Sequence, residues 1–193
     1  MRLEFKSVIT AKFVPQDNRI CLKRVINCNT DITKTMDDKH YMKQALKEAQ
    51  KAHDADEVPI GAVIVMQDTI IARGYNQVET LNDSTAHAEI IALTSAFNYL
   101  GSKYLPGATI YVTIEPCTMC CGALYWSKIG RLVYGAPDPK HGGLTPLHPG
   151  SYRDGGALTG RPVRLHPKTE IVNNVCAEEC VSLLKDFFKS KRK

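Results

Sequence analysis

The chain has 193 residues, of which 44% are hydrophobic and 23% are charged, and its formal net charge is +5. This composition is that of an ordinary globular protein, and the length suffices for one domain with a full core. No apolar run approaches transmembrane length, so we expect no membrane partner. Seven cysteines without a signal peptide argue against a disulfide framework and favour a reducing compartment, which predicts a cytoplasmic location.

The positive charge is concentrated at the two ends of the chain. Residues 1–35 hold seven Lys/Arg against three Asp/Glu, and residues 185–193 hold five against one, so each segment carries +4. Residues 36–184 hold thirteen against sixteen and carry −3. Because residues 1–35 also lack a sustained hydrophobic period, we predict an N-terminal extension there, disordered or a mis-assigned start, followed by one folded domain over 36–193.

The elements predicted from Met36 onward alternate between helix and strand. Helices are indicated by apolar residues on one face, and buried strands by β-branched runs. The expected elements are a helix from Asp37, strands over 62–66 and 70–75 joined by a short turn, a helix over 86–100, a strand over 109–113, a helix from Pro116 and a strand over 131–134. This order predicts an α/β sandwich whose sheet is partly parallel.

The last third of the chain is predicted to hold a long loop and one helix. Residues 136–168 are rich in proline and glycine and show little apolar pattern, which is typical of a loop. A helix then begins at about Ala177, its apolar side ends in Phe187 and Phe188, and a basic tail follows.

Two short motifs carry the chemistry: His87-Ala88-Glu89, and the pentapeptide Pro-Cys-Thr-Met-Cys over 116–120. A histidine and two cysteine thiolates are three of the four ligands of a tetrahedral zinc, and the missing fourth suits a catalytic zinc that holds a water. Glu89 is placed to take and return that water's proton. H-x-E followed by P-C-x-x-C is the signature of zinc nucleobase deaminases. A structural zinc or a redox C-x-x-C pair remains the alternative, and Glu89 argues against it because a structural site does not need that residue.

The predicted helix starts explain how the ligands meet. Residues 83–85 are capping types before the helix over 86–100, and Pro116 suits the first turn of the next helix. This arrangement would place His87 and Glu89 in one first turn and the two cysteines in another. Helix N-termini carry partial positive charge, which favours thiolates.

From Met36 the chain resembles the bacterial TadA-type tRNA-specific adenosine deaminases and, more loosely, the whole cytidine-deaminase superfamily. The matching segments are residues 57–63, 83–89, 111–120, 130–136 and 178–188. The zinc motif marks the superfamily only. The closing Asp186-Phe187-Phe188 with its basic tail points to the tRNA branch.

The resemblance implies a three-layer α/β/α sandwich with a mixed five-stranded sheet flanked by helices. It implies a cytoplasmic homodimer that converts the wobble adenosine of a tRNA anticodon stem-loop to inosine by means of a zinc-bound hydroxide. One Zn²⁺ per chain would be held by His87, Cys117 and Cys120, and Glu89 would be the catalytic residue. The domain over 36–193 would then be a zinc-dependent deaminase domain with a long loop over 136–168 and a basic C-terminal helix.

The same resemblance assigns the substrate contacts. Those expected are Asn76 and the Ala88 backbone at the purine, Asp138 and Lys140 at the anticodon loop, and Phe187, Phe188 and Lys189 on the last helix. The residues themselves leave two alternatives open. Asn76 is also compatible with a turn or cap residue. At least one of the two phenylalanines is compatible with packing in the core. The chain departs from the family at Pro137 and Pro139 and in a longer segment over 142–165, which concerns the RNA-contact loop and not the chemistry.

Two other functions remain open. A free-purine (guanine) deaminase shares the metal motif, and Tyr125-Trp126 after the cysteines is similar to that branch. The other alternative is a non-catalytic zinc-binding subunit that only helps to bind tRNA. The basic tail argues against the first alternative because a free purine has no phosphate, and Glu89 argues against the second.

Overall fold

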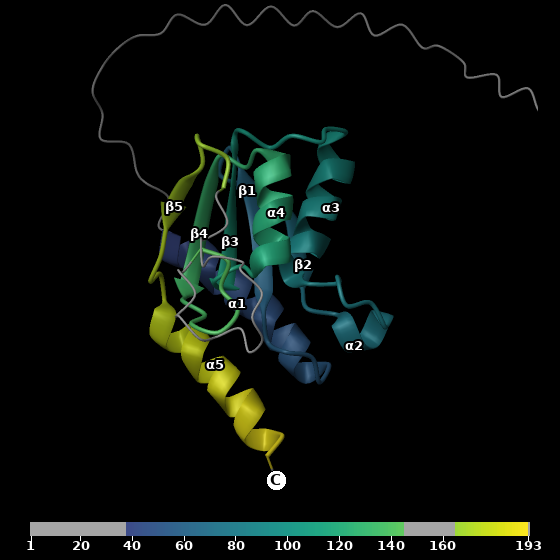
Figure 1. Cartoon of the computed structure of the whole chain (residues 1–193), viewed down its shortest axis with the longest axis vertical. Helices are drawn as coiled ribbons and strands as arrows, with labels where there is room; N and C mark the ends of the chain where they lie inside the picture. The colour runs from purple at the N-terminus through teal and green to yellow at the C-terminus, as the bar shows by residue number, and fades with distance from the viewer. Residues whose placement is uncertain (1–37, 145–164, 193) are drawn as a thin grey trace, which may run out of the picture. The chain divides into compact units, whose positions relative to one another are not determined.

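The computed structural model describes residues 38–144 and 165–192. The predicted extension over 1–35, residues 145–164 of the long loop and Lys193 lie outside these ranges. The elements in chain order are α1 (Asp38–Asp54), β1 (Gly61–Met66), β2 (Thr69–Tyr75), α2 (Val78–Leu81), α3 (Ala88–Leu100), β3 (Ala108–Ile114), α4 (Thr118–Ser127), β4 (Arg131–Ala136), β5 (Glu170–Val172) and α5 (Ala177–Ser190) (Figure 1). No helix in the described ranges is long and apolar enough to cross a membrane.

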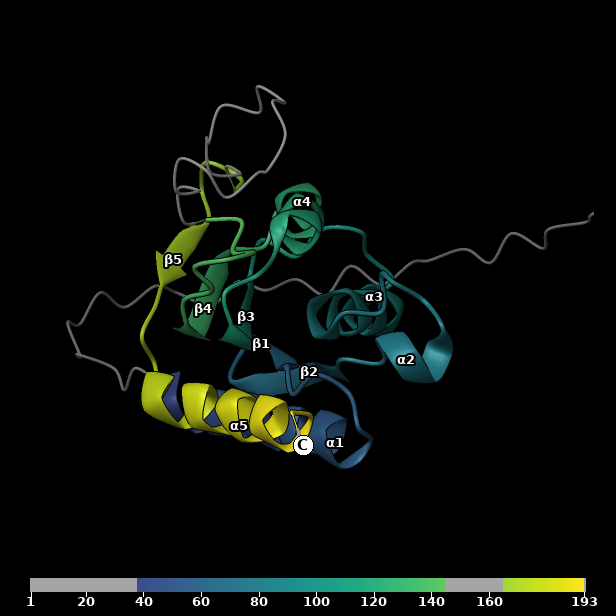
Figure 2. The ribbon, with the colours of Figure 1, turned by 60° about the horizontal axis from the view of Figure 1, so that its bottom comes forward.

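These strands form one mixed sheet in the order β2-β1-β3-β4-β5. β1 is antiparallel to β2 and β3, whereas β3, β4 and β5 run parallel. Figure 2 shows α1 and α5 against one face of the sheet and α3 and α4 against the other. The predicted three-layer sandwich with a five-stranded mixed sheet is therefore confirmed.

The central strand β1 contributes to both cores. Ala62 and Ile64 pack into the cluster under α3 and α4, and Val63 and Val65 pack into the cluster against α1 and α5. A strand covered on both faces needs an apolar residue at every position, which is why its sequence shows no polar alternation.

Two glycines allow helices to lie directly on the β1–β2 hairpin. A Cβ at Gly61 would overlap the backbone of α1 at the carbonyl of Ala45, and a Cβ at Gly74 would overlap the backbone of α3 at the carbonyl of Ala88. The second contact matters for the site, because it places the start of α3 on the sheet.

The predicted helix starts were wrong by two residues at both motifs. α3 begins at Ala88 with His87 as its N-cap, and α4 begins at Thr118 with Cys117 as its N-cap. Asp83 does not cap α3: its Oδ1 accepts hydrogen bonds from the backbone N–H of Thr85 (2.8 Å) and from its hydroxyl (2.7 Å), which closes a local turn.

Two short elements were not expected from the residues. α2 is four residues long and has no buried residue, and β5 is three residues long and mostly exposed. Such short, exposed segments carry no hydrophobic period, so pattern reasoning does not detect them.

Candidate active site

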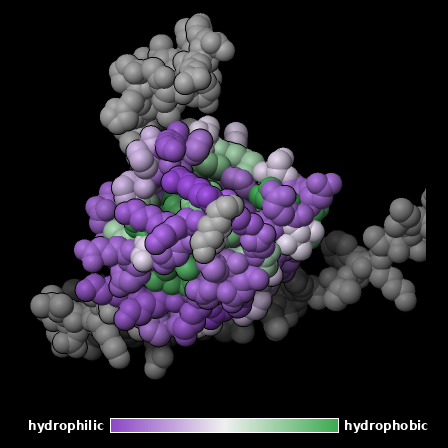
Figure 3. All heavy atoms as spheres, turned by 90° about the horizontal axis from the view of Figure 1, so that it is seen from below, coloured by the Kyte–Doolittle hydropathy of each residue, from purple (hydrophilic) through white to green (hydrophobic). Residues whose placement is uncertain are grey.

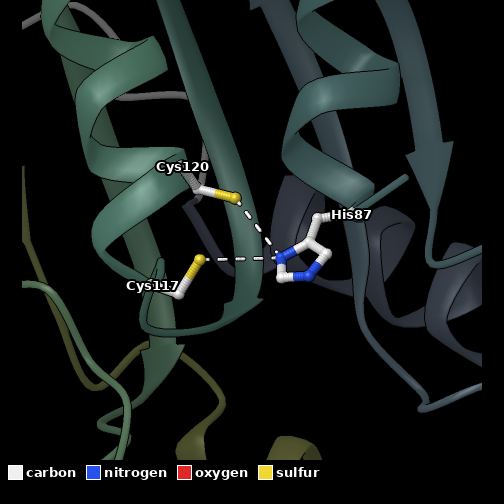
Figure 4. A group of neighbouring side chains, drawn as sticks. All are labelled: His87, Cys117 and Cys120. Carbon is white, nitrogen blue, oxygen red and sulfur yellow. Dashed lines mark hydrogen bonds between the residues drawn. The ribbon is translucent and has the colours of Figure 1, made fainter. Parts of the chain in front are cut away.

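The site is built at the starts of two helices on the same face of the sheet. His87 stands at the N-cap of α3, Cys117 at the N-cap of α4, and Cys120 in the first turn of α4. Figure 4 shows both cysteine side chains pointing at the His87 ring, with Nδ1 at 3.6 Å from Cys117 Sγ and 3.5 Å from Cys120 Sγ. The three donor atoms all lie within 4.8 Å of one another. The structure therefore brings together the three predicted ligands.

Their spacing fits a zinc ion. With Zn–S near 2.3 Å and Zn–N near 2.0–2.1 Å, the edge of a tetrahedron between sulfur and nitrogen is about 3.6 Å. Thiolate and imidazole donors are also the types that zinc selects. A hydrogen bond from Cys120, together with His87, lowers the pKa of Cys117 to about 4 although burial opposes it, so a thiolate forms readily at neutral pH.

Glu89 lies beside this group in the first turn of α3. It is 3% exposed, and among the side chains that the structure describes its Oε2 is buried without a hydrogen-bond partner. Burial raises the pKa of Glu89 to about 7. A carboxyl group that exchanges its proton near neutral pH, next to three metal-ligand atoms, is suited to general acid–base work and unnecessary for a purely structural metal site.

Asn76 directly follows β2 and is 5% exposed. Its Nδ2 donates to Glu57 Oε2 (3.2 Å), and the N–H of the next residue, Gln77, donates to the Ala86 carbonyl (3.0 Å). Because a carboxylate only accepts, Glu57 determines which way the Asn76 amide faces. Asn76 is not a helix cap, since α2 is capped by Gln77.

Glu57 is a residue that sequence reasoning missed. It is 1% exposed and also accepts the backbone N–H groups of Thr80 (2.7 Å) and Glu79 (3.3 Å). Burial alone would raise the pKa of Glu57, but these hydrogen bonds outweigh it and lower the pKa. The sequence did offer a signal for Glu57. It lies in the segment over 57–63 that carries the family resemblance, and there it precedes an apolar strand.

The loop that holds the predicted anticodon contacts passes beside the metal-ligand turn. Asp138 Oδ1 accepts the N–H groups of Lys140 (2.9 Å) and His141 (3.1 Å), and the Lys140 side chain is exposed. Gly142 forms an antiparallel bridge with Cys117. The loop and a ligand are thus neighbours, although they are far apart in sequence.

The residues predicted on the last helix are divided between core and surface. Phe187 is 5% exposed and lies edge-on to His53 (ring centroids 5.9 Å apart), whereas Phe188 is 44% exposed and Lys189 is exposed. Figure 3 shows the face that includes the C-terminal end of α5, and hydrophilic side chains cover most of it. Lys191, at the C-cap of α5, pairs with Asp56 (2.5 Å). Phe188 and Lys189 thus remain open to a ligand, while the Phe187 ring belongs to the core.

Comparison with known proteins gives the family context. Residues 35–136 match the model of the cytidine and deoxycytidylate deaminase zinc-binding region. The tRNA-specific adenosine deaminase of Bacillus subtilis is 44% identical over 158 residues, which cover 81% of this chain and 91% of that protein. This match extends well beyond the zinc-binding region.

Solved structures agree. A chain from biochemical and structural studies of A-to-I editing by tRNA:A34 deaminases at the wobble position of transfer RNA has a TM-score of 0.63 and 42% identity, covering 75% of this chain and 98% of that one. A guanine deaminase from Nitrosomonas europaea has a TM-score of 0.61 and 22% identity, covering 77% of this chain and 83% of that one, so it shares the fold alone.

Proposed function

The chain belongs to the zinc-binding cytidine and deoxycytidylate deaminase family, and from this premise we propose that it hydrolyses adenosine to inosine at the wobble position of a tRNA anticodon. The observation that carries the chemistry is the buried Glu89 carboxyl beside the His87, Cys117 and Cys120 donors, whose Oε2 has no hydrogen-bond partner among the residues that the structure describes. The adenosine and tRNA specificity is supported by the relatives, which match over most of the chain.

Zinc is the cofactor, and when bound it supplies the Lewis acidity that makes a water molecule nucleophilic near neutral pH. Glu89 accepts a proton from the attacking water and delivers it to the purine ring nitrogen N1. A new C–O bond forms at C6, the C6–N bond breaks, and Glu89 carries the second water proton to the departing amino group. The products are inosine and ammonia.

On the substrate side, the amide of Asn76 and the backbone of Ala88 contact the purine. The Asn76 amide is held by Glu57, and Ala88 directly follows the metal ligand His87 at the start of α3. The positions of both groups are therefore fixed. The RNA contacts come from Asp138, Lys140, Phe188 and Lys189, while Phe187 supports the helix from the core. Unpaired anticodon bases can be splayed out toward such a site at little cost.

Residues 36–193 constitute the deaminase domain of this proposal, and 1–35 are an accessory extension. The active form is a cytoplasmic homodimer. Two large exposed apolar side chains, Trp126 (75% exposed) and Met119 (36%), lie seven residues apart and therefore on the same side of α4, and a joined apolar patch there would favour self-association. Sedimentation velocity on the purified chain checks the dimer.

The proposal is tested by offering the purified protein an anticodon stem-loop with adenosine at the wobble position and, in parallel, free guanine. We expect inosine from the stem-loop, no xanthine from guanine, and one zinc per chain by elemental analysis. A Cys117→Ala/Cys120→Ala double variant should lose both zinc and activity. Deamination of guanine but not of the stem-loop would overturn the substrate assignment, and unchanged zinc in the double variant would overturn the metal site.

A further inference from the structure

We propose that Glu115 is a positioning residue that ties the loop over 137–144 to the turn carrying Cys117, and thereby holds Asp138 and Lys140 toward the RNA. The inference rests on the proposed function for its RNA side. Glu115 does not touch the substrate in this scheme, and its effect passes through the loop.

The first observation is the place of the Glu115 carboxylate. The residue stands between the end of β3 and Pro116, is 3% exposed, and its backbone N–H donates to the Ala136 carbonyl (2.8 Å). Its Oε2 accepts the backbone N–H of Asp138 (3.1 Å), and its Oε1 accepts the backbone N–H of Leu144 (2.9 Å). One buried side chain therefore binds both ends of the 137–144 loop.

Backbone contacts hold the same loop against the turn that carries the metal ligand Cys117. The Gly143 N–H donates to the Pro116 carbonyl (2.8 Å), and Gly142 bridges Cys117. A Cβ at Gly142 would stand 2.5 Å from the Glu115 carboxyl group, and a Cβ at Gly143 would stand 2.8 Å from Cys121 Sγ. Since real Cβ atoms do not approach other atoms this closely, and a Cβ at Gly142 would also stand 2.5 Å from the backbone carbonyl oxygen of Asp138, a side chain at either position would force the loop or its neighbours to shift.

Within the loop, Asp138 accepts the hydrogen bonds that fix the backbone conformation. Its Oδ1 accepts the N–H groups of Lys140 and His141, and its carbonyl accepts the N–H of Gly142 (2.9 Å). Asp138 therefore fixes the backbone at the exposed Lys140, and Glu115 fixes the backbone at Asp138. This succession of hydrogen bonds connects the metal-ligand turn to the loop that faces the RNA.

The Glu115→Gln variant distinguishes a role in holding the 137–144 loop from a general role in stabilising the fold. A carboxylate offers two acceptor oxygens, whereas glutamine offers one acceptor and an NH₂ donor, so one end of the loop loses its partner and meets a second donor. We expect faster hydrogen exchange in the peptide over 137–144, about a tenfold higher KM for the anticodon stem-loop, an unchanged kcat and unchanged zinc content. Gly142→Ala displaces the loop from the other side and should likewise speed hydrogen exchange over 137–144 and raise the KM.

Glu48→Gln is the matched control. Glu48 is also 3% exposed, but it pairs with Lys51 and Arg73 on the opposite face of the sheet. This variant should leave the KM and the exchange of 137–144 as in the unmodified protein. Three results overturn the inference: unchanged exchange in Glu115→Gln, faster exchange with an unchanged KM, or a loss of zinc or kcat. If the unmodified protein does not act on the stem-loop, the proposed function fails, and the exchange experiment still decides whether Glu115 holds the loop.

Discussion

The face of the sheet covered by α3 and α4 and the face covered by α1 and α5 are both well buried, and on each a helix approaches the strands closely at a glycine, Gly74 under α3 and Gly61 under α1, but the two faces differ in their charged contacts. On the first face, the helices approach the strands through small side chains, among them Ala88, Ala92 and Ala96. Among the described residues, no residue of α3 or α4 forms an ion pair.

The second face is held by charged and aromatic contacts between distant parts of the chain. The guanidinium of Arg131 binds both carboxylate oxygens of Asp38 (2.7 and 2.9 Å), and Tyr111 donates to the same carboxylate (2.9 Å). The rings of Tyr41 and Tyr111 lie 5.1 Å apart. The comparison indicates a division of labour: close backbone packing brings two helix N-termini together for the chemistry, and the opposite face supports the fold. Four predictions test this division.

The largest effect is expected at Glu89. In Glu89→Ala the proton carrier is lost while the three ligands remain, so deamination of the anticodon stem-loop should fall by about 10²–10⁴-fold. The zinc content and the melting temperature should change little, because the three ligands remain and, among the described residues, one of the two carboxyl oxygens, Oε2, has no hydrogen-bond partner to lose. A variant that has lost its zinc or has unfolded would instead identify Glu89 as part of the structural framework.

The next prediction compares the two faces directly. Gly74→Ala and Gly61→Ala each introduce a Cβ into the backbone of a covering helix, α3 in the first case and α1 in the second. Overpacking of this kind costs up to about 3 kcal/mol, so both should lower the free energy of unfolding measured in urea. Only Gly74→Ala should also lower zinc affinity and kcat, since α3 begins beside the ligand His87.

Zinc binding and kcat are measured in both variants at a temperature where each is folded. Equal losses of zinc in the two variants would mean that the faces are mechanically coupled, and the proposed division of labour would be wrong.

How much could be predicted from the sequence depends on whether a contact is made by side chains alone or also by the backbone. The ligand set was predictable because its side chains form recognisable motifs: Cys117 and Cys120 are a C-x-x-C pair, and His87, 30 residues before Cys117, belongs to an H-x-E motif. Glu57 and Glu115 were not found, because most of their partners are backbone N–H groups 22 to 29 residues away, and a backbone donor leaves no mark on the residue types. The burial of Phe187 and the exposure of Phe188 likewise depend on how α5 packs against α1.

A smaller effect is expected on the surface of α5. Lys189 is exposed, whereas Lys191 pairs with Asp56, so the two lysines differ although they lie two residues apart. Lys189→Ala should reduce the slope of log affinity against log salt by about 0.7, the value for one phosphate contact on single-stranded RNA. Lys191→Ala should reduce it less, because its charge is already partly neutralised.

Binding of the anticodon stem-loop is measured across a salt series for both variants. Identical slopes in the unmodified protein and Lys189→Ala would remove this residue from the RNA contact surface.

The smallest effect concerns Asp38 and depends on pH. The hydrogen bond from Arg131 is the largest cause that lowers the pKa of Asp38 in the folded protein. A carboxylate whose folded pKa is depressed stabilises the fold above its unfolded pKa, near 3.9, and this contribution is lost as the pH falls through the folded pKa. Asp38→Asn should therefore destabilise the protein by about 1 kcal/mol at pH 7, roughly 2–4 °C in melting temperature.

The difference between Asp38→Asn and the unmodified protein should then shrink as the pH falls below about 4. Melting temperatures at pH 7, 5 and 3 follow the change, and kcat at pH 7 serves as the reference for the site. Because Asp38 lies on the α1 side of the sheet, kcat should be unchanged. A difference that does not shrink at all between pH 5 and pH 3 would show that Asp38 acts by packing or by neutral hydrogen bonds, since those contacts do not depend on the charge of its carboxylate.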